Sequence, residues 1–354
     1  MEPVSETLPQ PTVADSAYGE NRFNIDAGSR SAASRDAAVA LQRLMDSELA
    51  QFEQQLSLEL HSDYASVNRL MESAAALQGK RLRARLVLLS ALACGGITPN
   101  SRRIAAVIEM VHAATLVHDD VLDNADTRRG APASHVTWGN RNSILLGDVL
   151  FSKACILAAA AGSCFVADRV GRAGLALCQG ELRQQNTIGK WSLSVDEYID
   201  ILRLKTGDLC AASSLLGGWS AGASDATMRA LETYGMQLGI AFQIYDDWLD
   251  VWGTAALGKP LGNDVANRKP TLPTLRLVQQ TPVGERDKLI AQLECGIITD
   301  QLHSAFDSSD ASAVTLDTAR QYAEDACNAL GSLPDSFARQ ALIVVAQQSV
   351  RRSR

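Results

Sequence analysis

The chain has 354 residues, of which 46% are hydrophobic, and its formal net charge is −7 at pH 7. This hydrophobic fraction supports a sizeable core and excludes a wholly disordered chain. The negative charge argues against general nucleic-acid binding, which needs a basic surface, but it leaves room for a local basic pocket. Seven scattered cysteines without a CxxC pair are typical of reduced thiols, and they exclude a disulfide framework or a zinc site of the usual spacing.

The first 33 residues are polar and are expected to form a flexible leader. They contain no apolar run able to act as a signal sequence, and no stretch of the chain approaches the ~20 apolar residues that span a bilayer. Residues 34–354 show no internal repeat and no linker. We therefore expect one domain over 34–354 in a cytoplasmic protein.

Proline placement is the most informative coarse feature for secondary structure. None of the ten prolines falls within 12–98 or within 133–259, and a proline costs a helix interior roughly 3 kcal/mol. These gaps are rich in Ala, Leu, Glu, Gln and Arg, which favours helices over strands. In chain order, helices are predicted at 34–60, 63–76, 80–95, 99–124, 138–162, 164–188, 194–219, 224–252, 270–281, 284–306, 311–331 and 335–350.

Several of these predicted helices are apolar around most of their circumference, for example from Ile104 to Val117 and from Leu145 to Ala161. Such helices belong in the centre of a bundle. The sequence therefore predicts an all-α fold, a single bundle of long helices. It also indicates that one apolar helix is shared across a subunit interface.

Two aspartate clusters follow apolar helical runs. The first holds Asp119, Asp120 and Asp123, and Asp119 and Asp123 share a helix face because they are four residues apart. Neighbouring carboxylates repel each other unless a hard cation such as Mg²⁺ lies between them. One such cluster alone is as well explained by a solvated acidic helix end.

The second cluster repeats the spacing of the first, with Asp246, Asp247 and Asp250. Carboxylates beside apolar side chains are costly unless a charge compensates them. Two such clusters predict facing walls that hold a polyphosphate through shared metal ions. Basic residues accompany them and suit a second, directly bound diphosphate; they are Lys80, Arg83, Arg128, Arg129, Lys205, Lys259 and Lys269.

Five blocks of the sequence resemble the signature blocks of the trans-isoprenyl diphosphate synthases, in the family's order over about residues 35–350. They are GKRLR, HAATLVHDDVLDNADTRRG, LLGDVLFSKA, LKTGDL and FQIYDDWLDVWGTAALGKPLGNDVANRKPTLP. The resemblance is greatest to the long-chain branch, which makes quinone side chains. It implies an all-α bundle around a central active-site cavity, a homodimer, and isopentenyl diphosphate and an allylic diphosphate as substrates. It also implies three Mg²⁺ ions per active site and leaves open a peripheral membrane contact for product delivery.

The resemblance also implies roles for individual residues. The main magnesium ligands would be Asp119, Asp123 and Asp246, supported by Asp120, Asp247 and Asp250. The allylic diphosphate would be held by Arg128, Lys205 and Lys259, and isopentenyl diphosphate by Lys80, Arg83, His112 and Arg129, with Lys269 also among the substrate-binding residues. The allylic cation would be steadied by Lys205, the Thr206 backbone and Gln243. His118 is expected to be structural.

Product length depends on the side chains one turn before Asp119, where Ala114 and Thr115 are both small. Short-chain members of the family usually carry an aromatic ring there. We therefore expect an open tunnel and a product of thirty to fifty carbons, with Met110 as a deeper partial floor. Alternatively, Ala114 merely lets two core helices pack closely, and another helix supplies the floor.

The chain departs from the family pattern at two places. Ala84 stands where proline is usual, which is expected to loosen a helix start, and Asn267-Arg268 stand where a glycine is usual. Three alternatives remain open: a farnesyl or geranylgeranyl diphosphate synthase, a terpene cyclase or squalene-type enzyme, and a non-catalytic subunit of a heteromeric synthase. The last typically loses an aspartate cluster, whereas this chain keeps both.

Overall fold

The computed structural model describes residues 32–75, 79–128, 130–253 and 261–351. This part of the chain is almost entirely helical, as predicted. Its first half contains α1 (Ala32–Leu60), α2 (Ala65–Ala75), α3 (Leu82–Ala93), α4 (Pro99–Leu122), α5 (Ser134–Trp138), α6 (Asn140–Ala159) and α7 (Cys164–Gln185). The second half contains α8 (Val195–Leu202), the π-helix η1 (Arg203–Gly207), α9 (Asp208–Ser220), α10 (Asp225–Trp252), α11 (Asn263–Ala266), α12 (Leu272–Gln280), α13 (Val283–Glu294), α14 (Asp300–Ser308), α15 (Ala311–Ala329), η3 (Leu330–Ser332) and α16 (Phe337–Ser349).

Three predicted helices differ in the structure. The helix predicted at 138–162 begins only after Gly139, and 284–306 divides after Gly296; both glycines adopt a positive φ that L side chains rarely accept. Residues 194–219 keep their helical course but pass through η1, where the backbone hydrogen bond from Asp208 reaches back to Arg203. A small hairpin that was not predicted pairs β1 (Thr127–Arg128) with β2 (Ala131–Pro132) directly after α4.

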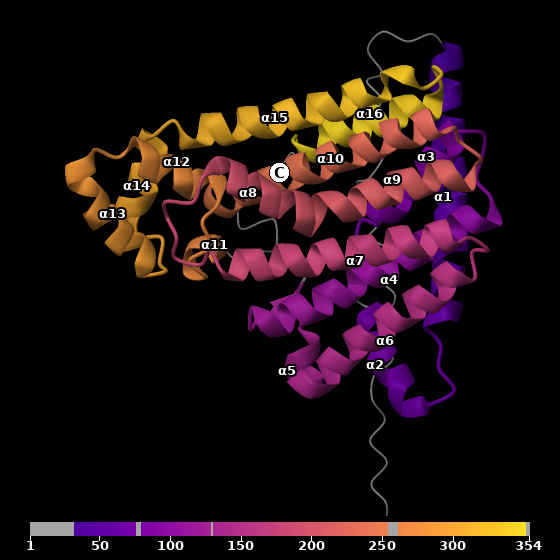
Figure 1. Cartoon of the computed structure of the whole chain (residues 1–354), viewed down its shortest axis with the longest axis horizontal. Coiled ribbons are helices and arrows are strands. Elements are labelled where there is room, and N and C mark those ends of the chain that lie inside the picture. The colour runs from indigo at the N-terminus through magenta and orange to yellow at the C-terminus, as the bar shows by residue number, and fades with distance from the viewer. Residues whose placement is uncertain (1–31, 76–78, 129, 254–260, 352–354) are drawn as a thin grey trace, which may run out of the picture.

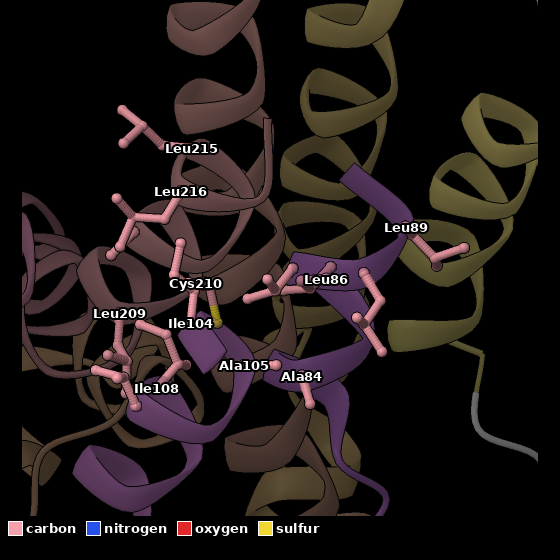
Figure 2. Close-up of a cluster of buried hydrophobic side chains, with 14 of the residues drawn as sticks. Ala84, Leu86, Leu89, Ile104, Ala105, Ile108, Leu209, Cys210, Leu215 and Leu216 are labelled. Atoms are coloured by element: carbon pink, nitrogen blue, oxygen red, sulfur yellow. The ribbon is translucent and has the colours of Figure 1, made fainter. Parts of the chain in front are cut away.

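The long helices lie side by side along the molecule. In Figure 1, α7, α9 and α10 run roughly parallel to the long axis, α15 and α16 cover α10, and α13 and α14 form a smaller group at one end. The main core lies where α3, α4 and α9 meet, as Figure 2 shows. It contains fully buried side chains such as Leu86, Leu89, Ile104, Ile108 and Leu209. The apolar run predicted for the bundle centre is therefore buried there.

Glycines set the spacing between α9 and α10. A Cβ on Gly235 would lie 2.3 Å from the backbone oxygen of Cys210, and one on Gly239 would lie 2.8 Å from the Cα of Gly207. Real Cβ atoms do not approach backbone so closely. The two helices therefore pack almost backbone to backbone. This contact fixes the distance between η1 at the start of α9 and the aspartate-bearing end of α10.

One helix differs from the sequence expectation about membranes. Among the described residues, α6 is long and apolar enough to cross a bilayer by length and composition, although the sequence was expected to contain no such stretch. A core helix passes the same test, and α6 packs against α4, α5 and α7. Its outward face nevertheless exposes apolar side chains, with Leu145 51% and Ile156 71% exposed.

Candidate active site

The first aspartate cluster lies at the C-terminal end of α4. This helix begins with a capping box in which Thr98 accepts the backbone N–H of Ser101, and its apolar run is buried. Asp120 is 1% exposed, and its Oδ1 accepts a 2.6 Å hydrogen bond from the Arg128 guanidinium on β1. The Oδ2 of Asp120 is buried without a hydrogen-bond partner. The hairpin after α4 therefore returns one predicted cation to the cluster.

Asp119 lies between acidic and basic neighbours. Burial raises its pKa to about 6, and the nearby carboxylate of Glu181 adds to the shift while Lys205 opposes it. Burial disfavours the ionised carboxylate, and the neighbouring positive charge does not fully offset that effect. A cation bound here would supply that charge.

The second cluster lies at the C-terminal end of α10 and is held from several sides. Asp247 is 6% exposed, accepts a 2.6 Å hydrogen bond from the Tyr198 hydroxyl on α8, and accepts a 2.9 Å bond from Gln243 Nε2. Burial raises its pKa to about 7, and the charges of Asp246 and Asp250 add to this shift. The Asp247 carboxylate, like that of Asp119, is therefore disfavoured in its ionised form.

Asp250 has a structural task within this cluster. Its two carboxylate oxygens accept the backbone N–H groups of Asn263 and Asp264, at 3.0 and 2.9 Å. Asp264 in turn accepts the backbone N–H of Lys269 through its carbonyl oxygen, at 2.8 Å. The predicted supporting metal ligand therefore also fixes the segment that carries Lys269.

Lys269 links the first cluster to the segment that Asp250 holds. The residue is 9% exposed, and its Nζ donates a 2.9 Å hydrogen bond to Asp123 at the first cluster. These residues are 146 positions apart in sequence. A chain of contacts from Asp250 through Asp264 and Lys269 to Asp123 therefore connects the two clusters. The Lys269 ammonium partly neutralises Asp123.

Lys205 and Thr206 enter the same region from η1. The Lys205 ammonium pairs with Glu181 and donates a 2.7 Å hydrogen bond to Gln184 on α7. Burial alone would lower the pKa of Lys205, but the charges of Asp119 and Glu181 outweigh burial and raise it. Thr206 donates through Oγ1 to Gln243 Oε1 at 3.1 Å. The predicted trio of Lys205, Thr206 and Gln243 is therefore brought together with both clusters.

The GKRLR block lies at the start of α3. Arg83 is half-buried, and its buried Nε has no hydrogen-bond partner, whereas Lys80 is exposed. Arg81, with a left-handed φ of 49°, pairs with Glu53 and Glu109 and has a structural task. An ammonium and a guanidinium three residues apart are side chains of the kind that suit a phosphate.

The departure at Ala84 does not loosen this helix start, contrary to expectation. The Ala84 backbone N–H donates to Glu109 Oε1 at 3.0 Å, and Ala84 is fully buried. A proline there would have no N–H to donate. The second departure is also accommodated: Arg268 adopts a left-handed φ of 50° and pairs with Glu294 at 2.9 Å. The left-handed conformation explains why a glycine suits that position.

The remaining predicted residues lie along α4. Ala114 is 2% exposed and packs with Leu146 and Leu150 of α6, while Thr115 is half-buried and bonds back to the carbonyl oxygen of His112. His112 is half-buried. Met110 and Leu150 border a cavity of about 10 Å³, room for roughly one water molecule.

His118 packs between α4 and α6. The His118 Nε2 lies 3.0 Å from the carbonyl oxygen of Ile144, and its ring fills the space left by Gly147, which agrees with a structural role. Arg129 and Lys259 lie outside the described residues.

Sequence reasoning missed Tyr198, Glu181 and Glu109. Tyr198 gave only a weak signal, an aromatic residue with a polar hydroxyl seven residues before Lys205. Glu109 carried only a weak signal, an acidic residue within the apolar run of α4, and Glu181 carried none because α7 holds several other charged residues. Their partners are distant in sequence, and no local spacing reveals them.

The donor set fits magnesium as an incomplete protein site. Among the residues that the structure describes, no three His, Cys, Asp or Glu side chains gather closely enough to hold a metal by themselves. Mg²⁺ commonly takes one or two carboxylates and completes its shell with water and phosphate oxygens. The orphaned Oδ2 of Asp120 and the raised pKa values of Asp119 and Asp247 are the features that a bound cation would relieve.

Comparison with known proteins agrees with this geometry. Residues 65–297 match the family model described as polyprenyl synthetase. The chain is 33% identical to octaprenyl diphosphate synthase of Escherichia coli, over 84% of this chain and 93% of that protein. It is 35% identical to a short chain isoprenyl diphosphate synthase of Methanothermobacter thermautotrophicus, over 76% of this chain and 85% of that protein.

A solved structure shares the fold. It is a polyprenyl synthase from Caulobacter crescentus CB15, described as complexed with calcium and isoprenyl diphosphate. The TM-score is 0.81 at 34% sequence identity, and the match covers 87% of this chain and 95% of that one. Together with the two aspartate clusters and the cations beside them, these matches show that the chain belongs to the polyprenyl synthetase family.

Proposed function

We propose that this chain is a magnesium-dependent all-trans polyprenyl diphosphate synthase, which condenses isopentenyl diphosphate with an allylic diphosphate to a product of thirty to fifty carbons. The observation that carries the proposal is the Lys269–Asp123 contact, which ties the Asp-rich end of α4 to the segment that Asp250 of α10 holds. Carboxylates gathered and partly buried in this way need cations to offset their charge. A metal-bound diphosphate supplies both the cations and an anion to be bound.

The reaction needs charge neutralisation and positioning, not a protein nucleophile. Magnesium, when bound, would neutralise charge that builds on the departing diphosphate. Lys205 and Arg128 would add fixed positive charge at that leaving group, which favours cleavage of the allylic C–O bond. The raised pKa of Lys205 keeps its ammonium charged for this task. Lys259 would contact the same diphosphate.

The second substrate would be held beside the first. Lys80, Arg83, His112 and Arg129 would bind isopentenyl diphosphate, and the unpartnered Nε of Arg83 supports this assignment. Its double bond then attacks the allylic cation, which the Thr206 backbone and Gln243 would steady. Gln243 is held in one orientation because it accepts from Thr206 and donates to Asp247. Loss of a proton, with the departing diphosphate as acceptor, completes the step.

The metal complement is proposed to be three Mg²⁺ per active site. Asp119, Asp123 and Asp246 would be the main ligands, and Asp120, Asp247 and Asp250 would support them. This proposal is supported by the raised pKa values on both walls. Removing divalent metal with EDTA should abolish turnover, and excess magnesium should restore it. Full activity in EDTA would contradict the metal assignment.

Product length is proposed to depend on the space beneath the first cluster. Ala114 and Thr115 add little bulk there, so the growing chain would pass between α4 and α6. Met110, beside the small cavity with Leu150, would form a deeper and flexible floor. The proposal is supported by the small side chains at both positions and by the long-chain relative.

The assembly is proposed to be a homodimer of a cytoplasmic enzyme, with at most a peripheral membrane contact for product delivery. It is supported by the neighbouring faces of α6 and α7, which expose Ile156, Leu145, Leu175 and Leu182 by half or more. Apolar faces of this kind are commonly buried in subunit interfaces. Sedimentation should give a dimer at micromolar concentration, and a monomer alone would contradict this assembly.

One experiment tests the proposed function directly. The purified chain is incubated with magnesium, labelled isopentenyl diphosphate and each of the dimethylallyl, geranyl and farnesyl primers, and the products are sized. A thirty-to-fifty-carbon product from the chain alone is expected. Products that stop at fifteen or twenty carbons would favour the short-chain alternative, and no product without a partner would favour the non-catalytic subunit.

A further inference from the structure

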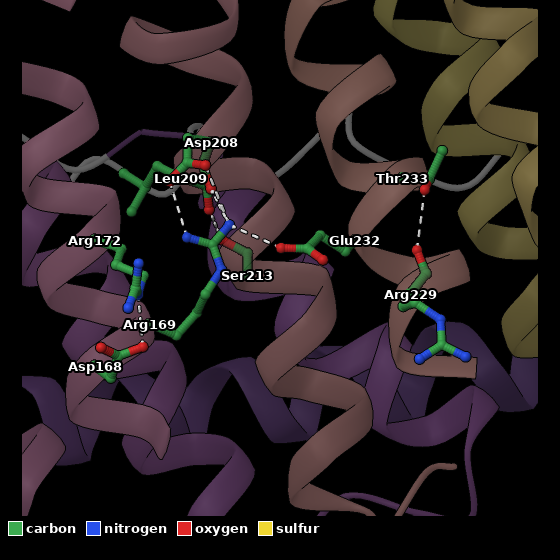
Figure 3. Close-up of polar contacts among 9 residues, drawn as sticks. All are labelled: Asp168, Arg169, Arg172, Asp208, Leu209, Ser213, Arg229, Glu232 and Thr233. Atoms are coloured by element: carbon green, nitrogen blue, oxygen red, sulfur yellow. Dashed lines mark hydrogen bonds and ion pairs between the residues drawn. The ribbon is translucent and has the colours of Figure 1, made fainter. Parts of the chain in front are cut away.

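A buried arginine ties three helices together next to η1. Arg169 on α7 is 8% exposed, and its Nη1 donates a 2.9 Å hydrogen bond to Asp208 Oδ2. Its Nη2 lies 3.3 Å from both the carbonyl oxygen and Oδ1 of Asp208, and also 3.3 Å from Glu232 Oε1 on α10. Figure 3 shows the guanidinium between these two acids. One charge therefore connects α7, α9 and α10.

Asp208 directly follows the segment that carries Lys205 and Thr206. Its backbone N–H donates to the carbonyl oxygen of Arg203, which closes the single π turn of η1. A π turn contains one residue more than an α turn and is uncommon without local support. If η1 relaxed to an α-helix, the residues before or after it would rotate by about 100° per residue gained or lost. Lys205 and Thr206 would then leave their partners.

The sides of η1 are already fixed by close backbone packing. A Cβ on Gly180 of α7 would lie 2.8 Å from the Lys205 nitrogen, and one on Gly239 of α10 would lie 2.8 Å from the Cα of Gly207. These contacts hold η1 between two helices. The bonds from Arg169 to the Asp208 carboxylate and carbonyl oxygen add a polar restraint against rotation at the C-terminal end of η1.

We propose that Arg169 and Asp208, with Glu232 as a supporting acid, are positioning residues that hold the π turn so that Lys205 and Thr206 point into the active site. They act through η1 and do not touch substrate. The inference rests on the proposed function only where kcat and KM are measured. The conformation of η1 can be measured without substrate.

The main test replaces Asp208 by asparagine, which keeps its shape and removes its charge. We expect kcat to fall about tenfold or more, since small misplacements of positioning groups have such effects. KM for isopentenyl diphosphate should stay within about twofold, because none of the residues assigned to that substrate lies in η1. Amide hydrogen exchange over residues 203–208 should become faster without substrate present.

Arg172 provides the matched control. It lies on α7 near Arg169, but its side chain is 71% exposed, and it pairs at 2.7 Å with Asp168 of the same helix. Arg172→Gln should leave kcat, KM and exchange over 203–208 within about twofold of the parent, as expected for an exposed ion pair.

A double variant distinguishes positioning from general destabilisation. If Asp208 acts through Thr206, the double variant Thr206→Val with Asp208→Asn should have nearly the same kcat as the less active of the two single variants. The reason is that the Thr206 contact is already lost in Thr206→Val. Losses that multiply, a kcat equal to the parent, or unchanged exchange over 203–208 would each overturn the proposal. Should Asp208→Asn fail to fold, Arg169→Lys, which keeps a cation but loses the forked contact, takes its place with the same readings.

An inactive parent enzyme would contradict the proposed function and not this inference. In that case the exchange measurement alone decides: faster exchange at 203–208 in Asp208→Asn but not in Arg172→Gln supports the positioning role, and equal exchange overturns it.

Discussion

The close packing of α9 and α10 gives the sharpest test of how the fold positions the site. In Gly235→Ala, the new Cβ would lie 2.3 Å from the Cys210 oxygen and 2.7 Å from the Ala211 Cα, whereas ordinary contact begins at 3.4 Å. Both neighbours are backbone atoms, which cannot turn aside like the end of a side chain. The two helices must therefore separate by about 1 Å.

The expected cost follows from two opposing effects. Overpacking in a core costs typically 1–3 kcal/mol, and a backbone clash belongs at the upper end, about 3 kcal/mol. Replacing a helical glycine by alanine stabilises the fold by about 1 kcal/mol, because alanine lowers the entropy of the unfolded chain and has a higher helix propensity. The free energy of unfolding should therefore fall by about 2 kcal/mol. Activity should fall as well, because Gln243 lies two turns further along α10 and would shift away from Thr206.

Gly171→Ala is the control for the propensity effect alone. Gly171 lies on the exposed side of α7, and a Cβ there would meet nothing within 4 Å. The free energy of unfolding of this variant should rise by about 0.5–1 kcal/mol. Urea unfolding followed by far-UV circular dichroism compares the midpoints of parent and variants. If the free energy of unfolding of Gly235→Ala equals that of the parent, or rises as much as that of Gly171→Ala, glycine does not set the spacing of α9 and α10.

Three further predictions concern the chemistry. Asp119→Ala or Asp246→Ala should lower kcat by several orders of magnitude while the circular dichroism spectrum stays helical, and near-parental activity with magnesium would contradict the two-wall site. Lys80→Ala and Arg129→Ala should raise KM for isopentenyl diphosphate, whereas Lys259→Ala should raise KM for the allylic substrate. Each increase should be about one to two decades, because a charge-assisted contact is worth about 1.5–3 kcal/mol. Steady-state kinetics with the opposite pattern would reverse the assignments. Ala114→Phe should shorten the product sharply while the first condensations proceed, and an unchanged product would show that another helix forms the floor.

Much of the fold and the chemistry could be predicted from local sequence alone. The proline-free stretches 12–98 and 133–259 predicted long helices, because helix formation depends on nearby residues. The spacing of Asp119 with Asp123, and of Asp246 with Asp250, predicted two acidic faces, because four residues make about one helical turn. The motif blocks then predicted the cations Lys205 and Lys269, and the structure brings both to the aspartates.

Other features depended on contacts between distant segments. Only the tertiary structure showed that Tyr198 donates to Asp247, that Glu109 receives the Ala84 amide, and that Glu181 neutralises Lys205. The π turn before Asp208 was likewise hidden, since its residues read as ordinary helix. Local periodicity determines which face of a helix a side chain occupies. Which helix lies against that face is decided by packing across the whole core, here through glycines that let α9 and α10 touch, and no single segment carries that information.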